Sequence, residues 1–129
     1  MINLLKFKRV FNQACNDIIT SEELNQKLGK IHLDESIISF VINEINGVIQ
    51  GDLSGSKLRV ITRVIYVYKH NRFTPPLISL LESFKEFDDD KLWDILSEVE
   101  FSFTVLGIIA GQEALDILEY FSLRELYWD

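Results

Sequence analysis

The sequence is poor in the residues from which covalent and metal-centred chemistry is built. It contains one cysteine, Cys15, so it can form neither an internal disulfide nor a cluster of thiolate ligands. Charged residues interrupt every apolar stretch before it reaches the roughly 18 residues that a membrane-spanning helix needs. Lys6, Lys8 and Arg9 follow a short apolar start, which is the wrong order for a signal peptide. We therefore expect a cytoplasmic protein without membrane contact.

The motifs of common catalytic and cofactor sites are missing as well. The sequence has no glycine-rich phosphate loop, no G-x-S-x-G and no H-E-x-x-H. The run 88–90 of three aspartates does not fit a metal site, because adjacent helical residues diverge by about 100°, and an EF-hand loop would need glycine where Trp93 stands. His32 and His70 lack ligand spacing, which favours surface or capping roles. We expect no enzyme, no cofactor and no metal.

What the chain does contain is enough apolar material for one core. It has 129 residues, of which 47% are hydrophobic, with nine Phe, four Tyr and two Trp. That length and composition predict a single folded domain over 1–129 and argue against intrinsic disorder.

Charge is distributed unevenly along the chain. Residues 1–72 hold seven acids and ten Lys or Arg, whereas residues 73–129 hold thirteen acids and only three Lys or Arg. The two parts therefore carry net charges of +3 and −10, which together give the −7 of the whole chain. An anionic surface disfavours nucleic acid and anionic lipid, and it favours a basic protein partner.

Apolar residues recur at helical spacing along most of the chain, so the expected fold class is all-α. Phe7, Phe11, Ala14 and Ile18 exemplify this spacing in the first helix. N-terminal caps are expected at Thr20, Asp34, Thr74 and Asp88, with Glu23 completing a capping box. A docked tail is expected at Leu126, Tyr127 and Trp128. The predicted helices lie near 2–18, 20–28, 34–50, 58–68, 74–87, 88–110, with a bend near Phe101, and 112–121.

Two stretches allow an alternative. Residues 58–68 are rich in β-branched side chains, and residues 99–105 alternate apolar and polar, so an α+β fold with strands there remains possible. The favoured reading is six to seven helices in antiparallel pairs, arranged either as a HEAT-like stack or as an irregular bundle.

The most informative stretch is 87–100, which holds six carboxylates, one lysine and a tryptophan. On a single helix, Asp90, Asp94 and Glu98 lie opposite an apolar stripe, with Trp93 and Glu100 at its border. Carboxylates at this spacing repel one another by roughly 0.2–0.5 kcal/mol per pair, and a neighbouring tryptophan is a frequent binding anchor. The predicted partner-binding residues are Glu82, Glu86, Asp89, Asp90, Trp93, Asp94, Glu98 and Glu100.

Other interpretations of the same residues stay open. The acids can form a solvated helix face without a partner, or they can pair internally with Arg59, Arg63 and Lys69. A helical adaptor or scaffold is the alternative function. It would use the Arg59/Arg63 face or an uncharged face on the third predicted helix, formed by Ser36, Ser39, Asn43 and Asn46.

In general character the chain resembles the bacterial immunity proteins of contact-dependent growth inhibition and other polymorphic toxin systems. Those proteins are small, intracellular, often acidic and often helical, and they lack catalytic motifs. The features that carry the resemblance are the acidic segment after residue 72 and the Asp90/Asp94/Glu98 face beside Trp93. The resemblance implies a stoichiometric inhibitor that binds a basic cognate toxin domain, commonly a nuclease, and blocks access to its active site.

Overall fold

The computed structural model describes residues 2–51 and 54–122, and all regular structure in them is helical. The all-α prediction is confirmed, with eight α-helices among the described residues against the six or seven expected. The elements are α1 (Ile2–Cys15), α2 (Ser21–Leu28), α3 (Glu35–Ile49), α4 (Gly55–Tyr68), η1 (Asn71–Phe73), α5 (Thr74–Ser83), η2 (Phe84–Glu86), α6 (Asp89–Asp94), α7 (Leu96–Ala110), η3 (Gly111–Ala114) and α8 (Leu115–Ser122).

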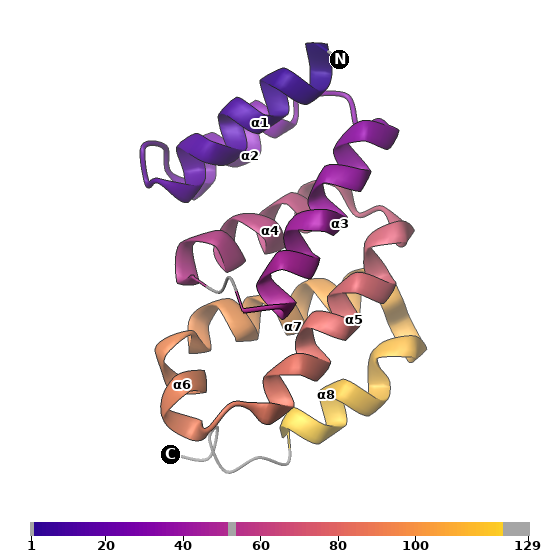
Figure 1. The fold of residues 1–129 in the computed structure, drawn as a ribbon. Coiled ribbons are helices and arrows are strands. Elements are labelled where there is room, and N and C mark those ends of the chain that lie inside the picture. The colour runs from indigo at the N-terminus through magenta and orange to yellow at the C-terminus, as the bar shows by residue number, and fades with distance from the viewer. Residues whose placement is uncertain (1, 52–53, 123–129) are drawn as a thin grey trace.

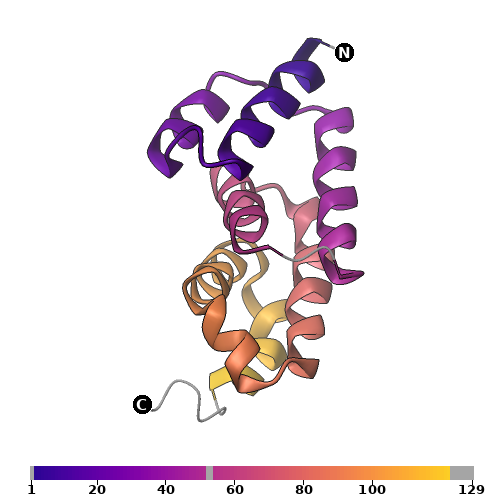
Figure 2. The ribbon, with the colours of Figure 1, turned by 60° about the vertical axis from the view of Figure 1, so that its left-hand side comes forward.

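The helices form a short stack of pairs in two layers (Figures 1 and 2). Helices α1, α3 and α5 follow one another in one layer, and α2, α4 and α7 follow one another in the other. Helix α6 is inserted between α5 and α7, and α8 packs on α5 at the end of the stack away from α1. Of the two arrangements predicted, the helices follow the stack of antiparallel pairs, and the short helices α6 and α8 extend its last pair. In the described part of the chain, none of the helices is both long and apolar enough to span a membrane.

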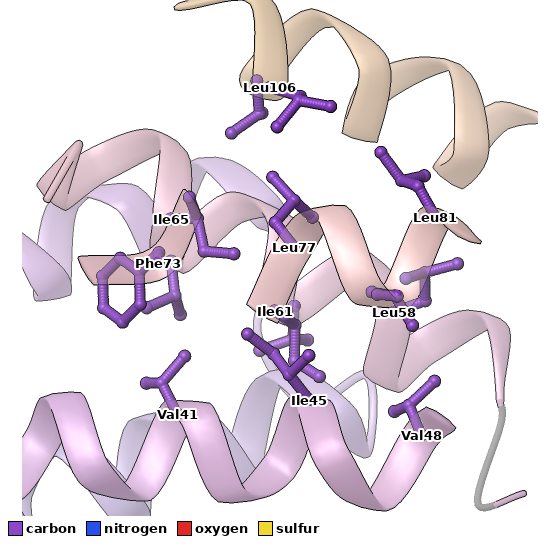
Figure 3. Packing of buried hydrophobic residues seen from close by; sticks show 14 of the residues in the cluster. Val41, Ile45, Val48, Leu58, Ile61, Ile65, Phe73, Leu77, Leu81 and Leu106 are labelled. Atoms are coloured by element: carbon purple, nitrogen blue, oxygen red, sulfur yellow. The ribbon is translucent and has the colours of Figure 1, made fainter. Parts of the chain in front are cut away.

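One apolar cluster runs through the stack, and Figure 3 shows the part of it in which side chains of α3, α4 and α5 meet. Ile45 of α3, Ile61 of α4 and Leu77 of α5 are each fully buried there. Helix α4 lies between neighbours in both layers, so most of its circumference is covered. This explains its β-branched composition, because burial outweighs a helix-propensity cost of a few tenths of a kcal/mol per residue. The helical alternative for residues 58–68 is therefore correct.

Local capping chemistry starts several helices where the sequence predicts. The Thr20 hydroxyl accepts from the Glu23 amide at 3.1 Å, and the Glu23 carboxylate accepts from the Thr20 amide at 3.1 Å. The Asp34 carboxylate accepts from the Ile37 amide at 3.0 Å, and the Asp88 carboxylate accepts from the Lys91 amide at 2.8 Å. Each bond satisfies an amide that the helix itself leaves without an acceptor.

Thr74 was expected to cap α5 in the same way, and this prediction is wrong. Phe73 holds the N-cap position and Thr74 is the first helical residue, because the 3-10 turn η1 leads directly into α5. The Thr74 hydroxyl is buried and has no hydrogen-bond partner among the described residues.

The single helix expected over 88–110 is divided at Ile95 rather than bent near Phe101. Ile95 ends α6 and precedes α7, with φ −120° and ψ 20°. The alternating residues 99–105 lie within α7, so the strand alternative is excluded there as well. Ser102 is fully buried despite being polar, because its hydroxyl donates to the Glu98 carbonyl at 2.8 Å.

The first and last helices differ from expectation at their ends. Helix α1 stops at Cys15, and Asp17 adopts a positive φ of 58°. The chain therefore turns early, so that Ile18 is 67% exposed and Ile19 is buried in its place. The helix expected over 112–121 begins with the 3-10 turn η3 and continues as α8. The expected docked tail, 126–128, lies outside the described residues.

Candidate functional site

The acidic segment is presented at one end of the stack, on the short helix α6 and the elements beside it (Figure 1). Leu92 is 1% exposed and Ile95 is 6% exposed, so these two side chains fix α6 to the core. Asp89, Asp90 and Asp94 are exposed around them. Asp89 and Asp90 lie in the first turn of α6, where negative charge complements the helix dipole and stabilises the helix.

Trp93 is the distinctive member of this region, because 56% of its surface is exposed. It lies between Leu92, which is buried, and Asp94, which is exposed. The lysine of the segment does not cover it: the Lys91 ammonium lies 3.9 Å from the centroid of the Phe87 ring. A large, rigid and partly apolar side chain therefore faces solvent among carboxylates, as a binding anchor does.

The two glutamates before α6 differ in their surroundings. Glu82, on α5, forms an ion pair of 2.9 Å with Lys85, whose ammonium also lies 4.6 Å from the Tyr120 ring centroid. Glu86, at the end of η2, is exposed two residues before the Asp88 cap. Both glutamates come before α6 in the chain. The charge of Glu82 is partly neutralised by Lys85.

The two glutamates after the break at Ile95 are set apart from α6. Glu100 is exposed on α7, whereas Glu98 is half-buried and lines a recess between α4 and α7. Because the helix is interrupted, Asp94 and Glu98 are no longer consecutive members of one helical ridge. The structure thus keeps Asp89, Asp90, Trp93 and Asp94 on one short helix and places Glu98 in a different environment. We call the eight predicted partner-binding residues the acidic surface.

The cations that could neutralise these acids internally have contacts elsewhere. The Arg59 guanidinium donates to Asp17 at 2.9 Å, to the Ser21 hydroxyl at 2.8 Å and to the Ala14 carbonyl at 3.1 Å, which ties α4 to the turn between α1 and α2. The guanidinium carbon of Arg63 lies 4.1 Å from the centroid of the Phe101 ring. The Lys69 ammonium lies 4.5 Å from the centroid of the Tyr66 ring.

The recess between α4 and α7 was not anticipated from the sequence. It has a volume of about 170 Å³, and its walls are Arg59, Thr62, Arg63, Ser97, Glu98 and Phe101. Its two halves are separated by more than thirty positions in the chain, so only the packing of α4 on α7 brings them together. The nearest sequence signal is the recurrence of Arg59 and Arg63 on one helical face.

A larger open cleft lies where η1 and the start of α5 meet α3 and α7. Its volume is about 620 Å³, and its lining includes Ile42, Arg72, Thr74, Pro76 and Ile109. Arg72 is already bound by Glu35 through both carboxylate oxygens. The cleft therefore offers an apolar floor with little uncommitted charge.

The histidines and the cysteine have structural surroundings. The Nδ1 atom of His70 accepts from the Arg72 amide at 3.1 Å, as a capping histidine does, and His32 is exposed. Burial raises the pKa of the Cys15 thiol to about 11, so the thiol stays protonated at neutral pH. Within residues 2–51 and 54–122, no three His, Cys, Asp or Glu side chains are grouped to hold a metal ion.

Comparison of the chain with protein-family models, with curated proteins and with solved structures finds no match. The functional argument therefore rests on the chemistry of the surfaces described above.

Proposed function

We propose that the protein is an immunity-type inhibitor that binds and neutralises a basic cognate toxin domain, with a nuclease as the expected activity. The observation that carries the proposal is the 56% exposed Trp93 among exposed carboxylates on α6. The acids attract a cationic domain over a distance of about a Debye length, some 8–10 Å at physiological salt. Trp93 then supplies apolar contact area that charge alone does not.

Inhibition of this kind needs no catalytic group on the inhibitor. A nuclease binds a polyanion, so its substrate site is lined with Lys and Arg. A carboxylate surface that covers those residues occupies the place of the phosphates and excludes the substrate. The proposed partner-binding residues are those of the acidic surface, and α6 is its centre.

The direct experiment measures binding to a basic toxin domain encoded beside this chain. We expect a one-to-one complex with nanomolar or tighter affinity, and the affinity falls as salt rises. The function is refuted if the toxin domain does not bind this protein. It is also refuted if the activity of the toxin domain is the same with and without it.

Replacing Trp93 by Ala tests the site. Trp93 is 56% exposed, and tryptophan buries up to about 250 Å², so a partner can cover roughly 140 Å² of it. At about 25 cal/mol per Å² the change weakens binding by up to about 3.5 kcal/mol, and hot-spot truncation costs at least about 2, or roughly 30- to 300-fold in Kd. The matched control is Leu115→Ala, since Leu115 is 54% exposed on α8. Equal effects of the two variants rule out α6 as the binding site.

Charge is tested separately with Asp90→Asn combined with Asp94→Asn. We expect the association rate at low salt to fall about tenfold and the difference from wild type to disappear at high salt. The control is Glu22→Gln combined with Asp116→Asn, which makes the same change in net charge at exposed positions on α2 and α8. If the control slows association as much, steering comes from net charge and not from α6.

The alternative function, a helical adaptor, is favoured by one observation. Ser39, Asn43 and Asn46 are all exposed along α3 and form an uncharged polar face. An adaptor would bind through that face, so its binding would be insensitive to salt and to the Trp93 substitution.

A further inference from the structure

The recess between α4 and α7 has chemistry that the acidic surface does not share. Glu98, one of the eight residues of the acidic surface, also lines the recess, so the two regions share this residue. The volume of the recess, about 170 Å³, is several times the share of about 30 Å³ that one molecule has in liquid water, so a small polar side chain fits.

Two polar residues of its lining, Arg59 and Thr62, already have hydrogen-bond partners. The Arg59 guanidinium is committed to Asp17, Ser21 and Ala14. The Thr62 hydroxyl lies within 3.0 Å of the Leu58 carbonyl of its own helix, to which it donates. Neither group therefore has a strong need for a further partner.

The side chains of Arg63 and Glu98, the other two charged residues of the lining, make no hydrogen bond or ion pair with another described residue. Arg63 is fixed against the Phe101 ring, and its Nε–H is buried without an acceptor in the described part of the chain. Glu98 is half-buried, and among residues 2–51 and 54–122 no ion pair or hydrogen bond to its carboxylate is formed. A donor and an acceptor thus line one small recess without binding each other.

Charge selects what can fill the recess. A cation is repelled by Arg63, and an anion is repelled by Glu98. Arg59 is paired with Asp17, which leaves one cationic and one anionic side chain in the lining, Arg63 and Glu98, so the remaining charges sum to zero. A neutral group that both donates and accepts hydrogen bonds matches it, and among protein groups that is an amide.

We propose that the α4–α7 recess binds an amide group of the protein partner between Glu98, which accepts, and Arg63, which donates. The amide comes either from an Asn or Gln side chain or from an exposed peptide bond. This inference rests on the proposed function for the identity of the partner, but not for the chemistry of the site. It assigns specificity to the recess: the acidic surface attracts basic domains in general, and the recess retains those that present an amide at the right place.

The test uses the free protein and small probes, with the Arg63 Nε–Hε signal in an NMR spectrum as the readout. The signal is assigned by its loss in Arg63→Lys. Propionamide represents the side-chain amide, N-methylacetamide the peptide group, propionate the carboxylate and methylguanidinium the cation. We expect a saturable shift with one or both amides, in the millimolar range that suits ligands of about five heavy atoms, and none with the ions. Which amide shifts the signal identifies the source.

A substitution makes the expectation sharper. Glu98→Gln keeps the shape of the side chain and removes its charge, so the recess becomes cationic. We expect the probe preference to change from amide to propionate. Glu100→Gln is the control, because Glu100 is exposed on the same helix and does not line the recess. It leaves the preference for amide unchanged.

The outcomes separate this inference from the proposed function. No saturable shift with either amide, an equal shift with an ion in the wild type, or no change of preference in Glu98→Gln overturns the recess assignment, whatever the toxin result. Amide binding in a protein that binds no toxin domain leaves the recess assignment standing and refutes the inhibitor. In a complex, Glu98→Gln is expected to raise the dissociation rate about tenfold without changing the salt dependence of association.

Discussion

Thr74→Val is expected to stabilise the protein, because it removes a buried hydroxyl that has no partner. Thr74 is 4% exposed at the first position of α5, and its oxygen makes no hydrogen bond to any described residue. In the unfolded chain the same hydroxyl is hydrated. Valine has nearly the same shape and is also β-branched before Pro75, so backbone preferences change little. Removing the desolvation cost should raise the free energy of unfolding by about 1 kcal/mol, within the usual 1–3 kcal/mol.

Thr62→Val provides a matched comparison in which the same chemical change has the opposite sign. Thr62 is fully buried in α4, and its hydroxyl lies 3.0 Å from the Leu58 carbonyl and 2.9 Å from the Arg59 carbonyl. Valine loses this hydrogen bond, so the free energy of unfolding should fall by about 0.5–1.5 kcal/mol.

Urea denaturation followed by circular dichroism measures both variants. The midpoint should move in opposite directions at an unchanged m-value, since neither substitution alters the surface exposed on unfolding. In a thermal scan, 1 kcal/mol corresponds to a shift in Tm of about 3–5 °C for a chain of this length. If Thr74→Val destabilises as much as Thr62→Val does, the Thr74 hydroxyl has a partner. In that case the capping role that the Thr-Pro-Pro sequence predicts is restored.

Two further substitutions test contacts that the sequence does not reveal. Arg59→Lys should lower the free energy of unfolding by about 1–3 kcal/mol, because lysine cannot reach Asp17, Ser21 and Ala14 together. Urea denaturation measures this change. The control is Arg72→Lys, at an exposed ion pair that contributes about 0–1 kcal/mol. Burial raises the pKa of Tyr68 to about 12, so the folded state holds the phenol proton more tightly than the unfolded chain, whose tyrosines titrate near pH 10. This contribution to stability is complete below about pH 10 and is lost as the pH rises towards 12. Tyr68→Phe should therefore reduce the loss of stability between about pH 10 and 12, and an identical loss in both proteins would count against the raised pKa.

The features predicted correctly from the sequence are those whose causes lie within a few residues. A cap such as Asp34 or Asp88 needs only its own carboxylate and an amide three residues later, and both are visible in the sequence. The exposure of Asp90 and Asp94 follows in the same way, because Leu92 and Ile95 must face the core. The prediction for Thr74 is wrong because η1 precedes it, and nothing in the Thr-Pro-Pro pattern distinguishes a capping residue from a first helical residue.

The break at Ile95 is invisible to periodicity for a specific physical reason. Leu92, Ile95 and Val99 are spaced as on one continuous helix, and all three are buried on both sides of the break. Since the core contacts satisfy the same pattern whether or not the helix is interrupted, hydrophobic spacing cannot report the interruption. The recess is unpredictable for a different reason: Arg63 and Glu98 come to line one recess only through the packing of α4 on α7.

The break also changes what the acidic segment can do. On one unbroken helix, Asp90, Asp94 and Glu98 would form a single ridge, and all three carboxylates would act together as long-range attraction. With the chain divided at Ile95, Asp90 and Asp94 stay exposed on α6, whereas Glu98 is half-buried beside Arg63. Exposed charges act mainly on the association rate, and half-buried hydrogen-bonding groups act mainly on the dissociation rate. Because Asp94 and Glu98 then affect different rate constants, combining their substitutions should give effects on Kd that add, despite their separation of four residues. A strong coupling between them would mean that the two groups contact the partner as one ridge, and that the division at Ile95 does not persist in the complex.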